Sequence, residues 1–196
     1  LALVLFAAGM AHAEEEKILN IYNWSEYIPQ EVLDRFTEET GIKIVYSTYE
    51  SNEAMYAKLK LLKGEGYDLV VPSTYFISQL KNDKLLQPID KDKISNFKLL
   101  MPRLVNQAFD PGNEYTVPYM WGSTGIMYNS KYVDGTLIKS WKDLLRPEFK
   151  GRVLISDDLR DGLGIGLKAC GYSINTKNEA ELKEAYEFLR KLKASV

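Results

Sequence analysis

Short apolar runs alternate with amphipathic stretches through the first half of the chain. The apolar runs predict strands, and residues at helical spacing, such as Val32, Leu33 and Phe36, predict helices between them. Strand, helix, strand, helix, strand implies right-handed βαβ units and a parallel sheet. The predicted strands are 18–22, 42–46 and 67–71, and the predicted helices are 29–40 and about 52–63.

The second half is less regular. A polar stretch reaching Asn113 precedes two extended segments, which would suit a crossing between two lobes. We therefore expect an α/β protein with a first lobe at 14–122 and part of a second lobe at 123–196. The further elements predicted are short helices at 76–80 and 140–146 (the latter opening with a capping-box-like Ser140 and Asp143), extended segments at 115–120 and 125–128, a strand at 152–155, and helices from about 157 to 170 and at 179–193.

Aromatic and acidic residues follow the first predicted strand. In α/β sheets, ligands bind beyond the carboxyl ends of the strands, and Trp24, Glu26 and Tyr27 fall there. Aromatic faces attract ammonium groups, and a carboxylate accepts charge-assisted hydrogen bonds, so this group would suit an organic cation. Alternatively, the rings belong to the core and Glu26 is a first-turn acid that favours the helix dipole. The segment Pro72–Tyr75 follows the third strand in the same way.

Two aspartates open a helix in the expected second lobe. Asp158 and Asp161 are three residues apart, hence on one side of the first turn. They could serve only to cap the helix and compensate its dipole. Together with aromatic residues from the first lobe, they would also suit a ligand whose positive charges are joined by methylenes, as in a linear polyamine. Each ammonium–carboxylate hydrogen bond contributes about 1.5–3 kcal/mol, and each buried methylene about 0.8 kcal/mol.

Residues 1–13 predict the final part of a secretory signal peptide. They carry no Lys, Arg, Asp or Glu, and their apolar run ends in Ala11-His12-Ala13, so cleavage is expected after Ala13. We expect an exported protein without a lipid anchor or a transmembrane helix. The absent initiator methionine and the abrupt stop at Val196 indicate a chain truncated at both ends.

Composition narrows the chemistry. His12 is the only histidine, so the mature part of this chain offers no Ser-His-Asp triad and no histidine-ligated zinc site. The single cysteine, Cys170, permits no intrachain disulfide and is interpreted as a small buried residue. The net charge of −2, with both signs interspersed, gives no indication of a nucleic-acid partner. No metal, cofactor or catalytic residue is predicted.

From Lys17 to Val196 the chain resembles the periplasmic spermidine/putrescine-binding proteins of bacterial ABC transporters. The most specific stretches are Tyr22–Tyr27 (YNWSEY) and Tyr67–Tyr75 (YDLVVPSTY). Further matching stretches are Glu39–Lys43 (ETGIK), Tyr46–Glu53 (YSTYESNE) and Trp141–Gly151.

The resemblance implies a two-lobed, type II periplasmic-binding-protein-like α/β fold whose C-terminal part is missing from this chain. It implies a periplasmic, non-enzymatic and monomeric receptor that closes on spermidine or putrescine in an interlobe cleft and docks to a membrane permease. The ligand-binding residues it implies are Trp24, Ser25, Glu26, Tyr27, Ser73, Tyr75, Asp158 and Asp161. Ser25 stands where the family is expected to have Thr, and Asp161 where it is expected to have Glu. The shorter Asp161 side chain leaves the preferred polyamine length open.

Other functions also fit parts of the sequence. Clustered tyrosines such as Tyr46 and Tyr49 could ligate ferric iron, and another organic cation could replace the polyamine. Asp158 and Asp161 could act as the paired carboxylates of a hydrolase or transferase, although one helical turn sets them too close for that chemistry. A sensor that reports polyamine to a membrane partner would have the same sequence features as a transport receptor.

Overall fold

The computed structural model describes residues 17–196. The predicted signal peptide, with His12 and the cleavage point after Ala13, lies outside these residues. The described chain forms two compact units, one of residues 17–88 with Ala108–Asp110, the other of residues 89–107 and 111–196. The lobe boundary expected after residue 122 stays a prediction.

A three-stranded parallel sheet forms the centre of the first unit, as predicted. It consists of β1 (Ile18–Trp24), β2 (Lys43–Tyr49) and β3 (Leu69–Val70), in the order β2-β1-β3. The third strand is shorter than the predicted 67–71. However, the Asp68 and Val71 amides donate to carbonyls of β1 at 2.9 and 3.1 Å, so the backbone pairing extends beyond the strand.

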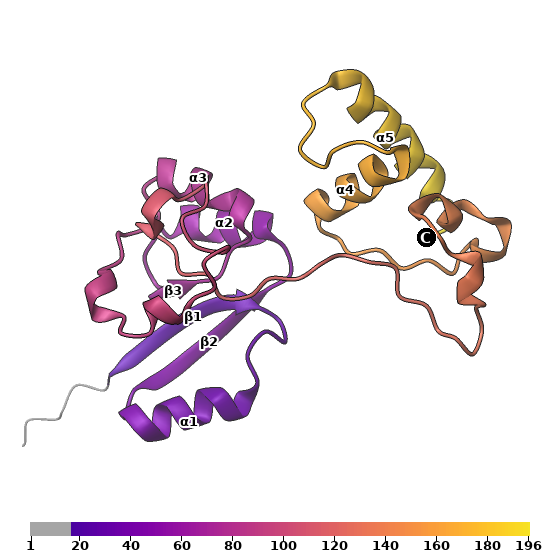
Figure 1. The fold of residues 1–196 in the computed structure, drawn as a ribbon. Helices are drawn as coiled ribbons and strands as arrows, with labels where there is room; N and C mark the ends of the chain where they lie inside the picture. The colour runs from indigo at the N-terminus through magenta and orange to yellow at the C-terminus, as the bar shows by residue number, and fades with distance from the viewer. Residues whose placement is uncertain (1–16) are drawn as a thin grey trace, which may run out of the picture. The chain divides into compact units, whose positions relative to one another are not determined.

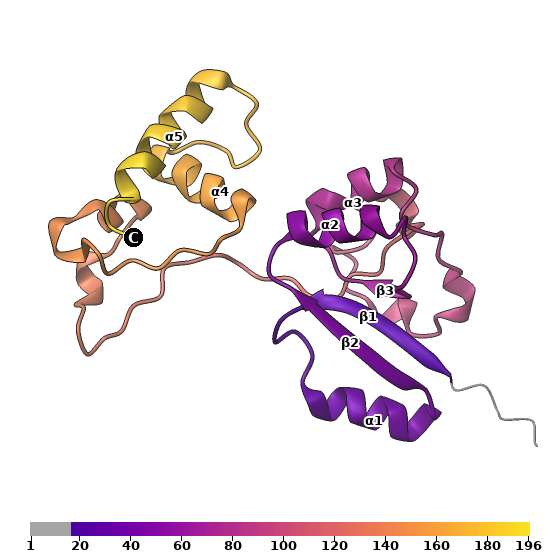
Figure 2. The same cartoon turned by 180° about the vertical axis from the view of Figure 1, so that it is seen from behind.

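Helices cover both faces of this sheet. Figures 1 and 2 show α1 (Gln30–Thr40) on one face, and α2 (Asn52–Leu61) and α3 (Thr74–Asn82) on the other. Gly41 ends α1 in the left-handed region with φ of 70°, as predicted from its place after the amphipathic pattern. The helix predicted at 76–80 is longer than expected because it begins at Thr74.

The core of the first unit lies between the sheet and the α2–α3 layer. Its buried side chains come from β1, β2, α2 and α3, and they are Tyr22, Tyr49, Met55, Leu59 and Leu80. Because Tyr22 and Tyr49 lie at or near the ends of β1 and β2, this core also fixes the position of the residues that follow these two strands.

An ion pair joins the separate segment Ala108–Asp110 to the rest of the first unit. The Lys81 ammonium at the end of α3 lies 3.2 Å from a carboxylate oxygen of Asp110. Asp110 is fully buried, and the Lys81 side chain is 25% exposed. Since a buried carboxylate needs a partner to offset its desolvation, this contact ties the returning chain to α3.

Two helices, α4 (Leu159–Cys170) and α5 (Glu179–Leu192), make the centre of the second unit and lie side by side in Figures 1 and 2. Their core includes Ile165, Phe188 and Leu192, with Leu144 from the 3-10 helix η5 (Trp141–Leu145). The helices approach closely at Gly166, where an added Cβ would lie 2.9 Å from the Ala185 carbonyl oxygen. The other 3-10 helices are η1 (Lys91–Lys93), η2 (Phe97–Leu99), η3 (Pro111–Asn113), η4 (Gly135–Leu137) and η6 (Pro147–Phe149).

Two local predictions for the second unit have different outcomes. The capping interaction at 140–143 is confirmed, because the Asp143 carboxylate accepts from the Ser140 amide at 2.8 Å. The strand predicted at 152–155 is wrong, since the structure has no regular element there. The Val153 amide donates to the Ser195 carbonyl at 3.1 Å rather than to a neighbouring strand, and apolar residues alone do not make a strand without such a ladder.

The segments 115–120 and 125–128 carry no regular secondary structure. Across residues 17–196, every helix is too short or too polar to cross a bilayer.

Candidate functional site

Trp24 is the last residue of β1, and its ring lies among other aromatic rings. The ring centroids are 4.7 Å from Tyr49 and 6.1 Å from Tyr27. Trp24 is half-buried and packs against the core of the first unit, whereas Tyr27 is 38% exposed. The interpretation of both rings as core residues therefore holds in part for Trp24 and fails for Tyr27.

The residues after β1 and β2 bring a hydroxyl and two carboxylates to the carboxyl edge of the sheet. The Ser25 hydroxyl donates to Glu50 at 2.5 Å, and Glu50 follows the end of β2. Glu26 is exposed in the turn with φ of 60°, and α1 begins only at Gln30. Glu26 is therefore not a first-turn acid of α1, and the dipole explanation for this residue is wrong.

Ser73 and Tyr75 lie at the beginning of α3, directly after the third strand. Ser73 is the residue before the first turn of α3, and the Tyr75 side chain is 38% exposed. Both contact the fully buried side chain of Asn52: the Ser73 amide donates to its Oδ1 at 2.9 Å, and its Nδ2 donates to the Tyr75 hydroxyl at 2.8 Å. The ends of β2 and β3 are thus joined through one side chain.

The backbone of Trp24 is held from two sides. Its amide donates to the buried Asn23 Oδ1 at 2.8 Å, and its carbonyl accepts from the Tyr46 hydroxyl at 3.2 Å. Within the described residues, the Asn23 Nδ2 is buried and has no hydrogen-bond partner.

The tyrosines considered as iron ligands do not form a metal site. Tyr46 and Tyr49 are three positions apart on β2 and hence point to opposite faces of the sheet. Burial raises the pKa of Tyr49 well above its usual value, and its hydroxyl donates to the Val71 carbonyl, so its phenolate is disfavoured. Residues 17–196 also contain no group of three His, Cys, Asp or Glu that could hold a metal ion.

A lysine of the chain already lies against tyrosine faces in this unit. The Lys58 ammonium lies 4.8 Å from the ring centroid of Tyr22 and 5.2 Å from that of Tyr67, and the two rings are stacked. A hydrogen bond with Tyr67 raises the pKa of Lys58. The aromatic side chains of this sheet therefore do interact with a protonated amine.

In the second unit, the two predicted aspartates adjoin each other. Asp158 is the N-cap of α4, and its Oδ1 accepts from the Asp161 amide at 2.9 Å. The Thr124 hydroxyl donates to Asp161 Oδ2 at 3.4 Å. The capping interpretation is therefore correct for Asp158, and both side chains are partly exposed.

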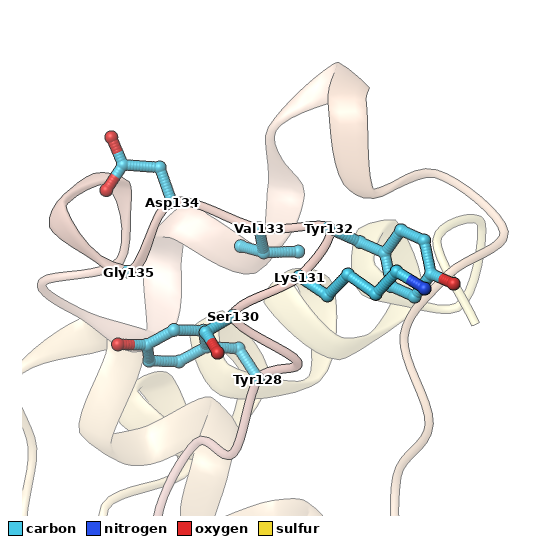
Figure 3. Close-up of a pocket in the computed structure, with 7 residues that line it drawn as sticks. All are labelled: Tyr128, Ser130, Lys131, Tyr132, Val133, Asp134 and Gly135. Atoms are coloured by element: carbon cyan, nitrogen blue, oxygen red, sulfur yellow. The ribbon is translucent and has the colours of Figure 1, made fainter.

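An open hollow of the second unit lies elsewhere. It is formed by the loop 128–135, and Figure 3 shows Tyr128, Lys131 and Asp134 among its lining residues. None of the eight predicted ligand-binding residues lines it, so this hollow does not identify the ligand site.

Sequence reasoning missed three residues that adjoin the predicted ligand residues: Glu50, Asn52 and Asn23. Glu50 could have been found, because it follows β2 as the predicted residues follow β1 and β3. Asn52 could not, since its partners are 21 and 23 residues further along the chain. Asn23 was missed because nothing in a strand sequence separates a buried amide from an exposed one.

Comparison with known proteins points to one family. Residues 31–196 match the family model described as bacterial extracellular solute-binding protein. The chain is 50% identical over its whole length to the spermidine/putrescine-binding periplasmic protein of Salmonella typhimurium and spans 57% of that protein.

Solved structures agree with this match. A Listeria monocytogenes protein superposes with a TM-score of 0.85 at 40% identity, covering 92% of this chain and 56% of that one. The spermidine/putrescine ABC transporter substrate-binding protein of Streptococcus pneumoniae gives a TM-score of 0.71 at 44% identity, covering 92% and 55% of the two chains. These matches confirm the α/β fold of periplasmic-binding-protein type, and the chain belongs to the bacterial extracellular solute-binding protein family.

Proposed function

We propose that this protein is a periplasmic receptor that binds spermidine or putrescine and delivers it to an ABC-type membrane permease. It would act as a monomer and catalyse no reaction. The proposal has support from the relatives, which are named as spermidine/putrescine-binding proteins and which this chain matches over half of their length.

The observation that carries the proposal is the group at the carboxyl edge of the sheet. The rings of Trp24 and Tyr27 lie 6.1 Å apart, Glu26 adds an exposed carboxylate in the same turn, and the exposed Glu50 accepts from the Ser25 hydroxyl. Aromatic faces pack on methylenes and attract ammonium groups, and carboxylates accept their hydrogen bonds. An alkyl chain with protonated amines has both complementary features. A sugar lacks the ammonium groups, and an amino acid carries a carboxylate that the glutamates would repel.

The roles proposed for individual residues follow from the same chemistry. Trp24 and Tyr27 would flank the alkyl chain, and Ser25 and Glu26 would contact amine nitrogens. Ser73 and Tyr75 would complete the wall that the first unit contributes to the site. Asp158 and Asp161 would each pair with an ammonium group. Ferric iron is not favoured, because Tyr46 and Tyr49 point to opposite faces of their sheet.

Calorimetric titration of the mature, full-length protein with a ligand panel tests this function. The panel is putrescine, spermidine, uncharged 1,4-butanediol, lysine and ferric citrate. We expect saturable one-to-one binding of at least one polyamine and none of the diol, which matches putrescine in length but has no charge. A folded protein that binds lysine or ferric citrate but no polyamine would refute the proposal.

A further inference from the structure

The Asn52 side chain hydrogen-bonds both a backbone group and a side chain among the proposed ligand residues. It begins α2, directly after the N-cap residue Ser51, and it is fully buried. Its two partners lie at the beginning of a different helix, α3. Asn52 therefore connects the segment after β2 to the segment after β3.

The orientation of the Asn52 amide is determined by its partners. The Ser73 backbone N–H can only donate, so it requires the oxygen of the amide, at 2.9 Å. The nitrogen must then face the Tyr75 hydroxyl, at 2.8 Å. The Tyr75 oxygen consequently receives a hydrogen bond from a buried and fixed donor, which limits where the ring can lie.

We propose that Asn52 is a positioning residue of the ligand site, which holds the Ser73 backbone and the Tyr75 hydroxyl in the arrangement that binds the polyamine. The proposal rests on the polyamine-binding function proposed above. Asn52 itself is buried beneath these residues and does not contact the ligand. It acts by pre-organising two partners that would otherwise be ordered at a cost during binding.

Leucine is the informative replacement, because it has nearly the same shape and can make neither hydrogen bond. Asn52→Leu in the mature, full-length protein should weaken spermidine binding about tenfold. Ser51→Ala is the matched control. It removes the N-cap hydrogen bond that Ser51 Oγ accepts from the Ala54 amide at 3.2 Å, and so weakens the same helix without touching Ser73 or Tyr75. Ser51→Ala should change the spermidine affinity less than about twofold.

A double-mutant cycle with Tyr75→Phe separates positioning from general destabilisation. If Asn52 acts through the Tyr75 hydroxyl, most of the loss caused by Asn52→Leu should disappear when that hydroxyl is already absent. An equal fold-loss in both backgrounds would overturn the role assigned through Tyr75, and unchanged affinity in folded Asn52→Leu would overturn the whole inference.

A ligand-free measurement distinguishes failure of this inference from failure of the proposed function. Hydrogen exchange at the Ser73 amide should be at least about tenfold faster in Asn52→Leu than in the wild type and unaffected in Ser51→Ala. Unchanged Ser73 exchange would contradict the positioning role whatever the ligand. If Ser73 exchanges faster in Asn52→Leu but the wild type binds no polyamine, the proposed function has failed, and the binding role of Asn52 fails with it.

Discussion

Trp24 belongs to the hydrophobic core of the first unit and to the proposed ligand site. One part of its surface packs on the core that includes Tyr49, while its backbone is held by Asn23 and Tyr46. Tyr27 differs, because it is more exposed and its ring contacts the ring of Trp24. At the residue scale, substitution of Tyr27 should therefore affect binding with little effect on folding, whereas substitution of Trp24 affects both.

Tyr27→Ala tests this distinction. Loss of one aromatic contact with an ammonium or alkyl group should weaken spermidine binding by about 0.5–2 kcal/mol, or roughly two- to thirtyfold. Tyr186→Ala is the matched control, since Tyr186 is a 60% exposed tyrosine of α5. Titration calorimetry of the two variants should separate them. Equal affinities would exclude Tyr27 from the site.

At the scale of elements, the N-terminus and the middle of α4 have different roles. Its N-terminus is capped by a proposed ligand residue, Asp158, and its middle packs against α5 through Gly166. Gly162, in the first turn, has open space where a Cβ would be added. The two glycines therefore have opposite physical roles within one helix.

Alanine at each glycine should accordingly change stability in opposite directions. Gly166→Ala forces a Cβ against the Ala185 carbonyl and should lower the free energy of unfolding by about 1–3 kcal/mol. Gly162→Ala should raise it by about 0.5–1 kcal/mol, because it removes backbone entropy from the unfolded chain without a clash. Urea unfolding followed by circular dichroism measures both. Stabilisation by Gly166→Ala would show that the two helices are not held at this distance.

The capping interaction before η5 should make the second unit sensitive to acid. Hydrogen bonds from the Lys139 and Ser140 amides lower the pKa of Asp143 in the folded protein. Because the folded pKa lies below the unfolded value, this stabilisation is complete above the unfolded pKa, near pH 4, and is lost as the pH falls through the folded pKa.

Thermal unfolding of Asp143→Ala from pH 6 down to pH 2.5 measures this effect. The wild type should be more stable than the variant at pH 6, and the difference should shrink as the pH falls below 4. Asp92→Ala, which removes an exposed acid of the same unit, is the control. A difference between wild type and Asp143→Ala that does not depend on pH would contradict the role of the carboxylate.

At the scale of the whole molecule, the sequence alone predicted most helices and strands and the exposed residues that follow the strands. The strands β1 and β2, the helices α1, α2 and α5 and the parallel sheet were predicted from short apolar runs and helical apolar spacing, and α4 was predicted from the acidic residues at its start. The strand at 152–155 was not correctly predicted, since a strand depends on a partner that the local sequence does not contain. In the candidate site, exposed residues after strands could be identified, but the buried Asn52 and Asn23 could not. Their importance lies in contacts between distant segments.

The Lys81–Asp110 pair is another such contact. Asp110→Ala removes the buried half of this pair and should destabilise the first unit by about 1–3 kcal/mol. Asp90→Ala, which breaks the exposed pair of Asp90 and Lys93, should cost less than about 1 kcal/mol. Urea unfolding of the two variants compares them. Equal small losses would mean that the buried pair does not hold the segment 108–110.

The central claim, that this protein binds polyamines through Trp24 and Asp158, is tested most directly by one titration series. Spermidine would be titrated calorimetrically into the mature, full-length wild type and into Trp24→Ala and Asp158→Asn, each checked for folding by circular dichroism. The account predicts one-to-one binding by the wild type and affinity at least about tenfold weaker in each variant. A folded wild type that gives no saturable binding, or folded variants that bind as tightly as the wild type, would contradict it.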